Sequence, residues 1–147
     1  MELKKMILPI LTAIILTSCG SDHPGQTYED YQRLQLLDLS AVNDTIAYSQ
    51  TVQLVNDPEP YHGYIIRIDG LFGYLNEDGT EYFSILVQDE TKCCMEGMDF
   101  ELKEPKKYPD DFPPLGSPII VQGVFDSYQA ENGNKYCCLR EAEMATL

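Results

Sequence analysis

The fold is decided by two similar stretches, IRIDGLF at residues 66–72 and IIVQGVF at residues 119–125. They align with Gly70 on Gly123, and in each an aliphatic-Phe pair follows the glycine. Aliphatic and β-branched residues predict strands, and a glycine inside a strand is typical of a bulge or sharp bend in a curled sheet. The chain is therefore expected to contain the same bent strand twice.

Each bent strand is followed by a hairpin signal. The turns are NEDGT at residues 76–80 and AENGN at residues 130–134, and the returning strands begin near Tyr82 and Tyr136. Asp-Gly and Asn-Gly pairs suit tight hairpin turns because these residues tolerate positive φ. Two bent hairpins are thus predicted.

The segment between the hairpins contains MDFELKEP (98–105), a predicted short strand, and KKYPDDFPPLGSP (106–118), a proline-rich loop. Two bent hairpins with a single strand between them are the strand order of an OB-type barrel. The predicted fold class is mainly β: a five-stranded OB-like barrel over residues 61–145, preceded by one or two helices within 28–56. Together they form one OB-like domain, 28–147. An open α+β sheet is the alternative.

Two segments before the barrel are predicted to be helical. The first, TYEDYQRLQLLDL (27–39), opens on a capping-box-like pattern and has apolar residues at helical spacing. The second, NDTIAYSQTVQLVNDPEP (43–60), also fits the alternation of a strand. A helix is favoured there, beginning near Asn43 and ending at Asp57, because the residue before a proline is pushed out of helical geometry.

The N-terminus, MELKKMILPILTAIILTSC, has the pattern of an export signal. Lys4 and Lys5 precede an apolar run that is too short to span a bilayer as a permanent helix. Its end, LTSC, resembles a bacterial lipobox, which implies cleavage before Cys19 and attachment of lipid to the Cys19 sulfur. We expect a signal peptide over 1–18 and a lipidated flexible tether over 19–27. The alternative is an ordinary signal peptide with a chance cysteine.

The chain is strongly acidic, with a formal net charge of −14. Such a surface repels phosphate backbones, so no nucleic-acid partner is expected. Lipid on Cys19 would make the membrane one partner, since several acyl chains form a stable anchor. The expected location is the bacterial cell envelope, where the protein would be anchored to the outer membrane and face the periplasm or the surface. An unidentified protein is expected as a second partner.

The cysteines other than Cys19 form two adjacent pairs, Cys93 with Cys94 and Cys137 with Cys138. The first hypothesis is a thiophilic metal ion, zinc or copper, bound through Cys93 and Cys94. Because neighbours on a strand face opposite ways, one cysteine of each pair is expected to bind it, together with a third group. The candidates for that third group are His62, Asp89 and Glu96.

Other interpretations of the cysteines stay open. A disulfide could join one member of each pair, and closing a loop of about 45 residues would stabilise the fold by roughly 3–4 kcal/mol. A strained disulfide between Cys93 and Cys94 would suit a thiol-redox protein. If Met95 and Met98 are ligands, their thioether sulfurs would favour Cu(I) over zinc. The alternative is that both methionines fill the core.

Motifs of conventional catalysis are missing from the sequence, which has no Gly-x-Ser-x-Gly, no His-Glu-x-x-His and no phosphate-binding glycine loop. Its two histidines are His23, within the predicted tether, and His62. A binding module is therefore predicted rather than an enzyme.

Short motifs along residues 43–145 also carry a family resemblance. They are Asp-Pro-x-x-Tyr-x-Gly before the first barrel strand, Asp-x-Thr-x-Cys-Cys after the second, and a glycine-rich late strand. The matching positions are Pro58, Tyr61, Gly63, Asp89, Thr91, Cys93, Cys94, Gly97, Gly116 and Gly123. In these motifs the chain resembles a group of little-characterised bacterial OB-fold-like proteins. It is more distantly similar to the soluble C-terminal domain of a membrane-protein family associated with metal uptake. The resemblance implies an OB-type fold and points to the Cys-Cys segment, although Tyr64 stands where that pattern favours lysine.

Overall fold

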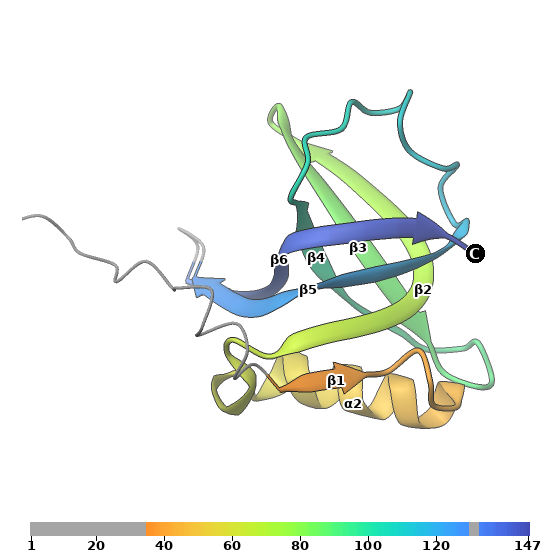
Figure 1. Cartoon of the computed structure of the whole chain (residues 1–147), viewed down its shortest axis with the longest axis vertical. Coiled ribbons are helices and arrows are strands. Elements are labelled where there is room, and N and C mark those ends of the chain that lie inside the picture. The colour runs from red at the N-terminus through yellow and green to blue at the C-terminus, as the bar shows by residue number, and fades with distance from the viewer. Residues whose placement is uncertain (1–34, 130–132) are drawn as a thin grey trace, which may run out of the picture.

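The computed structural model describes residues 35–129 and 133–147, and within these ranges the protein is mainly β with one α-helix. The predicted signal peptide, Cys19, the tether and residues 28–34 of the first predicted helix lie outside the described residues. The elements, shown in Figure 1, are β1 (Leu36–Asp38), α2 (Asp44–Asn56), the 3-10 helix η1 (Glu59–Tyr61), β2 (Ile65–Glu77), β3 (Thr80–Gln88), β4 (Met95–Leu102), β5 (Pro118–Gln129) and β6 (Lys135–Thr146).

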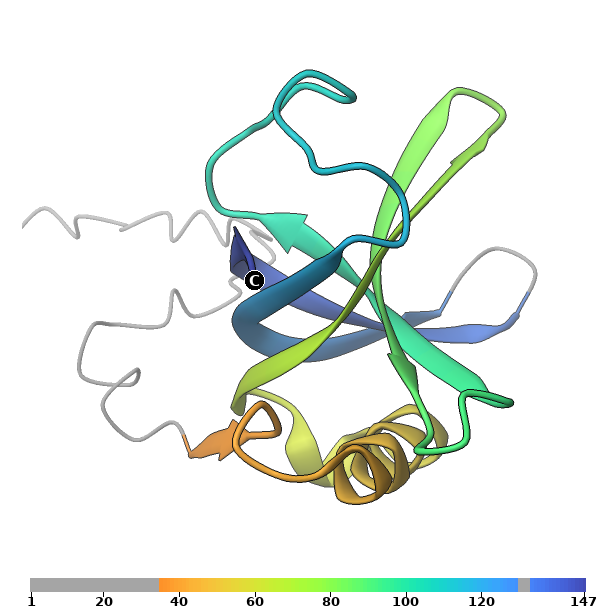
Figure 2. The ribbon, with the colours of Figure 1, turned by 90° about the vertical axis from the view of Figure 1, so that its right-hand side faces the viewer.

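The strands form one six-stranded sheet in the order β1-β2-β3-β4-β6-β5. Strand β5 also pairs with β2, so that strands β2 to β6 curl into a partial ring (Figure 2). The two predicted hairpins, β2–β3 and β5–β6, and the single strand β4 between them are all present. The alternative fold required an open sheet. The sheet is not open, because β5, at the end of the strand order, also pairs with β2.

Strand β1 is a sixth strand beyond the five that were predicted, and it corrects the prediction of a helix through residue 39. It pairs in parallel with the start of β2, with Leu36 beside Ile65 and Asp38 beside Arg67. The Leu39 amide donates to the Arg67 carbonyl at 2.7 Å. The first half of β2 offers unpaired backbone groups on this edge, and pairing with them outweighs the helical spacing of the leucines.

Both mid-strand glycines lie at bends, as predicted. Strand β2 pairs with β5 up to Leu71 and with β3 from Leu71 onward, so it changes partner next to Gly70. A Cβ on Gly70 would lie 2.6 Å from the Leu86 carbonyl oxygen. In β5, the register with β6 shifts at Gly123, where a Cβ would lie 2.8 Å from the Arg140 carbonyl oxygen. Close backbone approach thus requires glycine at both positions.

The β2–β3 turn has the backbone that the Asp-Gly pair predicts. Asp78 and Gly79 have φ values of 51° and 87°. Positive φ at both central residues is the type I′ pattern, whose twist matches that of the flanking strands. The Gly79 amide also donates to the Asn76 side chain at 3.2 Å.

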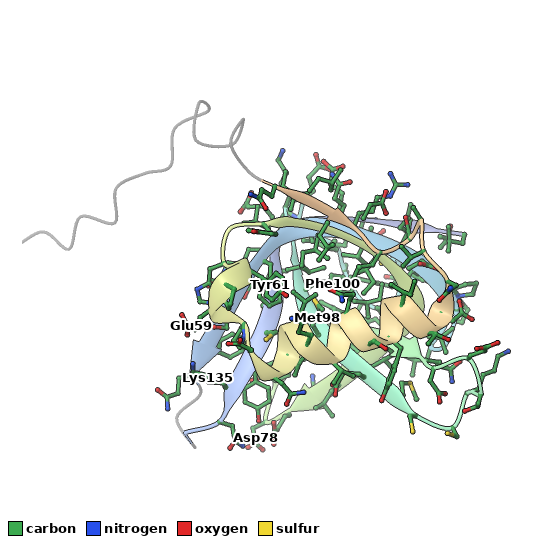
Figure 3. The ribbon with its side chains drawn as sticks, turned by 90° about the horizontal axis from the view of Figure 1, so that it is seen from below. Glu59, Tyr61, Asp78, Met98, Phe100 and Lys135 are labelled. Atoms are coloured by element: carbon green, nitrogen blue, oxygen red, sulfur yellow. The ribbon has the colours of Figure 1, made fainter. Side chains whose placement is uncertain are left out.

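Helix α2 confirms the helical prediction for the segment after Asn43. The Asn43 side chain accepts a hydrogen bond from the Ile46 amide at 2.9 Å and caps the first turn. Ala47, Thr51 and Leu54 are buried against the sheet. Seen from below, α2 lies across the sheet in front of Met98 and Phe100 (Figure 3).

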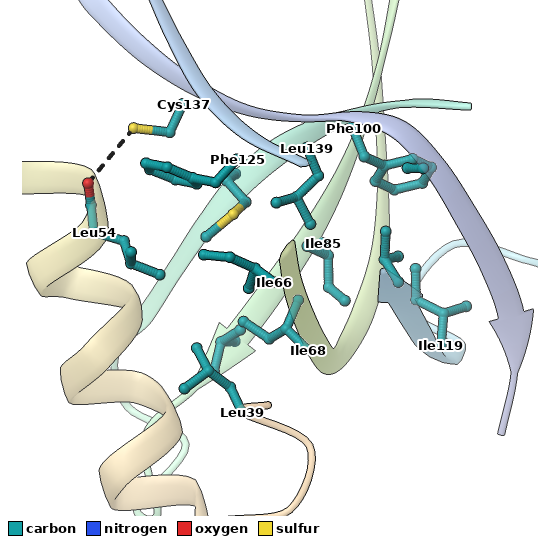
Figure 4. Packing of buried hydrophobic residues seen from close by; sticks show 14 of the residues in the cluster. Leu39, Leu54, Ile66, Ile68, Ile85, Phe100, Ile119, Phe125, Cys137 and Leu139 are labelled. Atoms are coloured by element: carbon teal, nitrogen blue, oxygen red, sulfur yellow. Dashed lines mark hydrogen bonds between the residues drawn. The ribbon is translucent and has the colours of Figure 1, made fainter. Parts of the chain in front are cut away.

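The core lies inside the partial ring and beneath α2 (Figure 4). It is formed by alternate residues of the strands, as expected for a sheet with one buried face. Its fully buried large side chains include Phe72, Phe100, Phe125, Leu54, Ile66, Ile68, Ile85, Ile119 and Leu139.

The proline-rich segment 103–117 has turns and no helix, and it closes one end of the core with aromatic rings. Tyr108 stacks on Tyr74 with ring centroids 3.8 Å apart, and Phe112 stacks on Phe83 at 4.3 Å. Helix α2 has 13 residues, and no helix in the described part of the chain has the length and apolarity needed to cross a membrane.

Candidate functional site

The first cysteine pair lies in the short loop between β3 and β4, at residues 89–94, and not on a strand. Two backbone hydrogen bonds shape this loop: the Asp89 amide donates to the Cys94 carbonyl at 3.1 Å, and the Lys92 amide donates to the Asp89 carbonyl at 2.9 Å. Lys92 has a φ of 57°, which turns the chain sharply just before the cysteines. The expectation that neighbouring sulfurs face opposite ways therefore does not hold here.

The Asp89 side chain organises the loop. Its Oδ1 accepts hydrogen bonds from the amides of Cys93 and Cys94 at 3.0 and 3.2 Å. Its Oδ2 lies 2.7 Å from the Thr91 hydroxyl, which donates to it. The hydroxyl of Thr91, followed by these amides, lowers the pKa of Asp89, so the group is a carboxylate at neutral pH.

The two sulfurs lie on the same side of the loop as this carboxylate. Cys93 Sγ is 3.5 Å from Cys94 Sγ, 3.4 Å from Asp89 Oδ2 and 3.0 Å from Thr91 Oγ1. One ligand atom from each of Asp89, Cys93 and Cys94 lies within 4.8 Å of the others, and both cysteines are exposed. Two sulfurs and one oxygen are thus presented together to solvent.

The electrostatics of the loop favour the protonated thiol at Cys94. The pKa of Cys94 is raised, chiefly by its hydrogen bond with Cys93 and by the negative charge of a Cys93 thiolate. Desolvation and the charge of Asp89 raise it further. A divalent metal ion reverses this situation, because its own charge favours thiolate at both cysteines.

The first turn of helix α2 contacts the loop through a side-chain hydrogen bond. The Thr45 hydroxyl donates to Glu90 Oε2 at 3.0 Å, which ties the first turn of the helix to the loop. One turn further on, Tyr48 packs against the core, and its pKa is raised by desolvation and then by the charges of Cys94 and Glu96. The loop is therefore held between the ends of two strands and a helix.

The second cysteine pair lies elsewhere and is buried. Cys137 is 5% exposed, and its sulfur lies 3.7 Å from the Leu54 carbonyl oxygen. Figure 4 marks this contact with a dashed line. Cys138 is 1% exposed and lies beside Asp99 of β4. Burial raises the pKa of Cys137 to about 11 and that of Cys138 to about 12. These thiols are protonated and shielded from solvent.

The strand register separates the two pairs. Strands β4 and β6 run parallel with Asp99 beside Cys138, which places Cys137 near Met98. Cys94 precedes Met98 by four residues, or about 13 Å along an extended chain. A disulfide requires Cα atoms within about 7 Å, and the four cysteines in the described part of the chain are free thiols. The structure therefore does not bring Cys137 or Cys138 together with Cys93 and Cys94, either as a metal-ligand group or as a cross-link.

Most of the other candidate ligands lie away from the sulfurs of Cys93 and Cys94. Of the three predicted third ligands, only Asp89 lies with the sulfurs. His62 bonds to Ser127 at 2.8 Å through Nε2, and the Glu96 carboxylate accepts from the Gly97 amide. Met98 is buried in the core, whereas Met95 is exposed. The role of Thr91 was not predicted, although the Asp-x-Thr spacing, which lets the hydroxyl reach back to the carboxylate, could have signalled it.

Comparison with known proteins adds little to this description. No protein-family model and no curated protein matches the chain. Among solved structures, the OB domain of Ta0387 from Thermoplasma acidophilum matches with a TM-score of 0.29 and 10% sequence identity, over 77% of this chain and 87% of that one. This likeness is too slight to support a fold or a function, so both must be argued from the strand pairings and the site itself.

Proposed function

We propose that the protein is a metal-binding module that holds one thiophilic ion through Cys93, Cys94 and Asp89. The observation that carries this proposal is the grouping of two thiols and a carboxylate oxygen within 4.8 Å on an exposed loop. The backbone amides that fix the Asp89 carboxylate hold part of the ligand set in place before the ion binds.

Zinc is the ion that fits this donor set best. Zinc binds sulfur and carboxylate oxygen together in tetrahedral sites, whereas Cu(I) selects soft sulfur ligands alone. Three protein ligands leave a fourth position for water or for a ligand from another molecule. An exposed site with such a position suits exchange of the ion, as in carriage or delivery, more than a permanent structural role.

The setting that we propose for this site is an OB-type barrel, formed by β2 to β6 and anchored to a bacterial membrane by lipid on Cys19. The return of β5 to β2 supports the barrel, and the LTSC motif supports the anchor. We propose a binding role without catalysis, with a protein that donates or accepts the ion as the partner and no role for nucleic acid. The net charge of −14 supports cation capture from the surroundings.

Native mass spectrometry of the purified, reduced protein with one equivalent of Zn²⁺ tests the metal site. We expect one zinc adduct that a chelator removes. Cys93→Ser and Cys94→Ser should each lose the adduct, because a neutral hydroxyl replaces a thiolate ligand.

The matched control is Cys137→Ala, which removes a thiol that faces Leu54 and not the loop. This variant should keep the adduct. A zinc adduct that survives in the Cys93→Ser, Cys94→Ser double variant would show that the ion binds elsewhere.

A further inference from the structure

We propose that Cys93 and Cys94 form a reversible disulfide with each other, and that its formation expels the metal ion. This inference rests on the proposed function, because the same two sulfurs serve as metal ligands. It makes the loop a redox-controlled metal site: the reduced pair binds, and the oxidised pair cannot.

The position of the sulfurs is the first argument. Cys93 Sγ and Cys94 Sγ are 3.5 Å apart, and both cysteines are exposed. A disulfide is about 2.05 Å long, so the sulfurs must approach each other by roughly 1.5 Å. They are carried by a loop, where side-chain rotation does not disturb a strand ladder.

The contrast between the two pairs is the second argument. Cys137 and Cys138 are also adjacent, but they lie within β6, where neighbours point to opposite faces. Both are buried, so an incoming oxidant has no access to them. The structure thus offers only the first pair, among the described cysteines, for thiol–disulfide exchange.

The strain of the product is the third argument. Adjacent Cα atoms are about 3.8 Å apart across a trans peptide, whereas disulfides prefer at least about 4.4 Å. A disulfide between neighbours is therefore strained and easily reduced, which suits a switch more than a permanent cross-link. Its two sulfurs have lost their negative charge, so the ion would retain Asp89 as its only charged ligand in the group.

The oxidant that we invoke is a disulfide R–S–S–R, either a small molecule or a protein. One cysteine thiolate attacks a sulfur of R–S–S–R, which forms a mixed disulfide and releases RS⁻. The second thiolate attacks the bound cysteine sulfur, closes the Cys93–Cys94 bond and releases the second RS⁻. Two electrons pass from the cysteine pair to the oxidant, and the metal leaves as a hydrated cation.

Tryptic cleavage provides a direct readout, because it separates the two pairs. Cleavage after Lys92 and Lys103 gives peptide 93–103 with the first pair, and cleavage after Lys135 and Arg140 gives peptide 136–140 with the second. The experiment titrates the full-length, zinc-loaded protein with oxidised glutathione. Released zinc is followed with a colorimetric chelator, and free thiols are alkylated before digestion.

We expect peptide 93–103 to lose two hydrogens while one zinc is released per disulfide formed, and dithiothreitol to restore both. Peptide 136–140 should stay reduced. Cys94→Ser should stop at a glutathione adduct on Cys93, because the resolving thiol is gone. Zinc that stays bound after oxidation, or a lasting glutathione adduct on the natural sequence, would overturn the inference.

Failure of the proposed function would look different. The reduced protein is first tested for zinc binding without any oxidant. If it binds no zinc, the proposed metal-binding function is wrong. Loss of two hydrogens from peptide 93–103 on oxidation would still establish the Cys93–Cys94 disulfide.

Discussion

Asp89 shows how one side chain can prepare a site for an ion. Its Oδ1 accepts from two amides, and its Oδ2 accepts from the Thr91 hydroxyl and from the Cys93 thiol. The carboxylate therefore has a structural role and a proposed ligand role at once. Separating these two roles requires a substitution that keeps the shape and removes the charge.

Asp89→Asn makes that separation. The asparagine oxygen can still accept from the amides of Cys93 and Cys94, so the loop should keep its conformation. We expect zinc affinity to fall by at least roughly 10- to 100-fold, the range for residues that only support a ligand, because Asp89 is proposed to be a ligand itself. Competition titration against a chelator measures it. Glu90→Gln removes one charge from the same loop and is the control; an equal loss of affinity there would mean that net charge alone matters.

Asp99 is a second informative carboxylate, partly buried beside Cys138. Burial raises its pKa, the charge of Glu101 adds to this, and the hydrogen bond from the Tyr128 hydroxyl at 3.3 Å opposes it. The folded protein therefore holds this proton more firmly than the unfolded chain does. Between the ordinary pKa of aspartate and the raised value, the contribution of Asp99 to stability falls as pH rises.

Asp99→Asn removes the buried charge and keeps an acceptor for Tyr128. We expect the variant to be more stable than the natural sequence at neutral pH, because the charged form of Asp99 is disfavoured by burial. The difference should vanish at a pH below the ordinary pKa of aspartate, where the carboxyl group is protonated in both the folded and the unfolded state. Urea denaturation at both pH values measures this; a less stable variant at neutral pH would contradict it.

At the scale of the elements, the bends in β2 and β5 depend on glycines that face the backbone of a neighbouring strand. In Gly123→Ala, the new Cβ would lie 2.8 Å from the Arg140 carbonyl oxygen and 3.0 Å from the Leu139 Cβ. Both neighbours belong to β6 and cannot move alone. We expect the free energy of unfolding to fall by about 1–3 kcal/mol.

Chemical denaturation of Gly123→Ala measures this cost. Gln122→Ala, at the exposed neighbouring position of the same strand, is the control and should change stability by no more than about 0.5 kcal/mol. If the two variants lose equal stability, the close approach at Gly123 is not what constrains that position.

These elements also show what the sequence could and could not predict. The hairpins were predictable because Gly70, Gly123 and the Asp-Gly turn are local signals of bending and reversal. Strand β1 was not, because its pairing depends on a free edge of β2 that exists only in the folded sheet. The site was half predictable: Cys93, Cys94 and Asp89 are close in sequence, whereas the separation of Cys137 depends on the β4–β6 register.

At the scale of the whole molecule, metal binding and folding are coupled if the ion binds only the folded loop. An unfolded chain does not hold the Asp89 carboxylate against the two amides, so zinc should favour the native state. At a free zinc concentration about 100 times the dissociation constant, the stabilisation is about 2.7 kcal/mol. For a domain of this size, the melting temperature should rise by on the order of 10 °C.

Thermal unfolding with and without zinc, under reducing conditions, tests this coupling. Cys93→Ser should lose the shift, and Cys137→Ala should retain it whatever its own melting temperature. A shift of equal size in all three proteins would mean that zinc acts away from the loop.

The pairing of β2 with β5 has a consequence for the order in which the chain folds. Ile65 of β2 lies beside Val124 of β5, which follows it by about 60 residues. The β2–β3 hairpin can form from local contacts, but the ring cannot close until β5 has been synthesised and has crossed to the other edge of β2. Such distant contacts incur a large loop-closure entropy before they stabilise the fold, so folding should be slow compared with that of a helical domain of equal length.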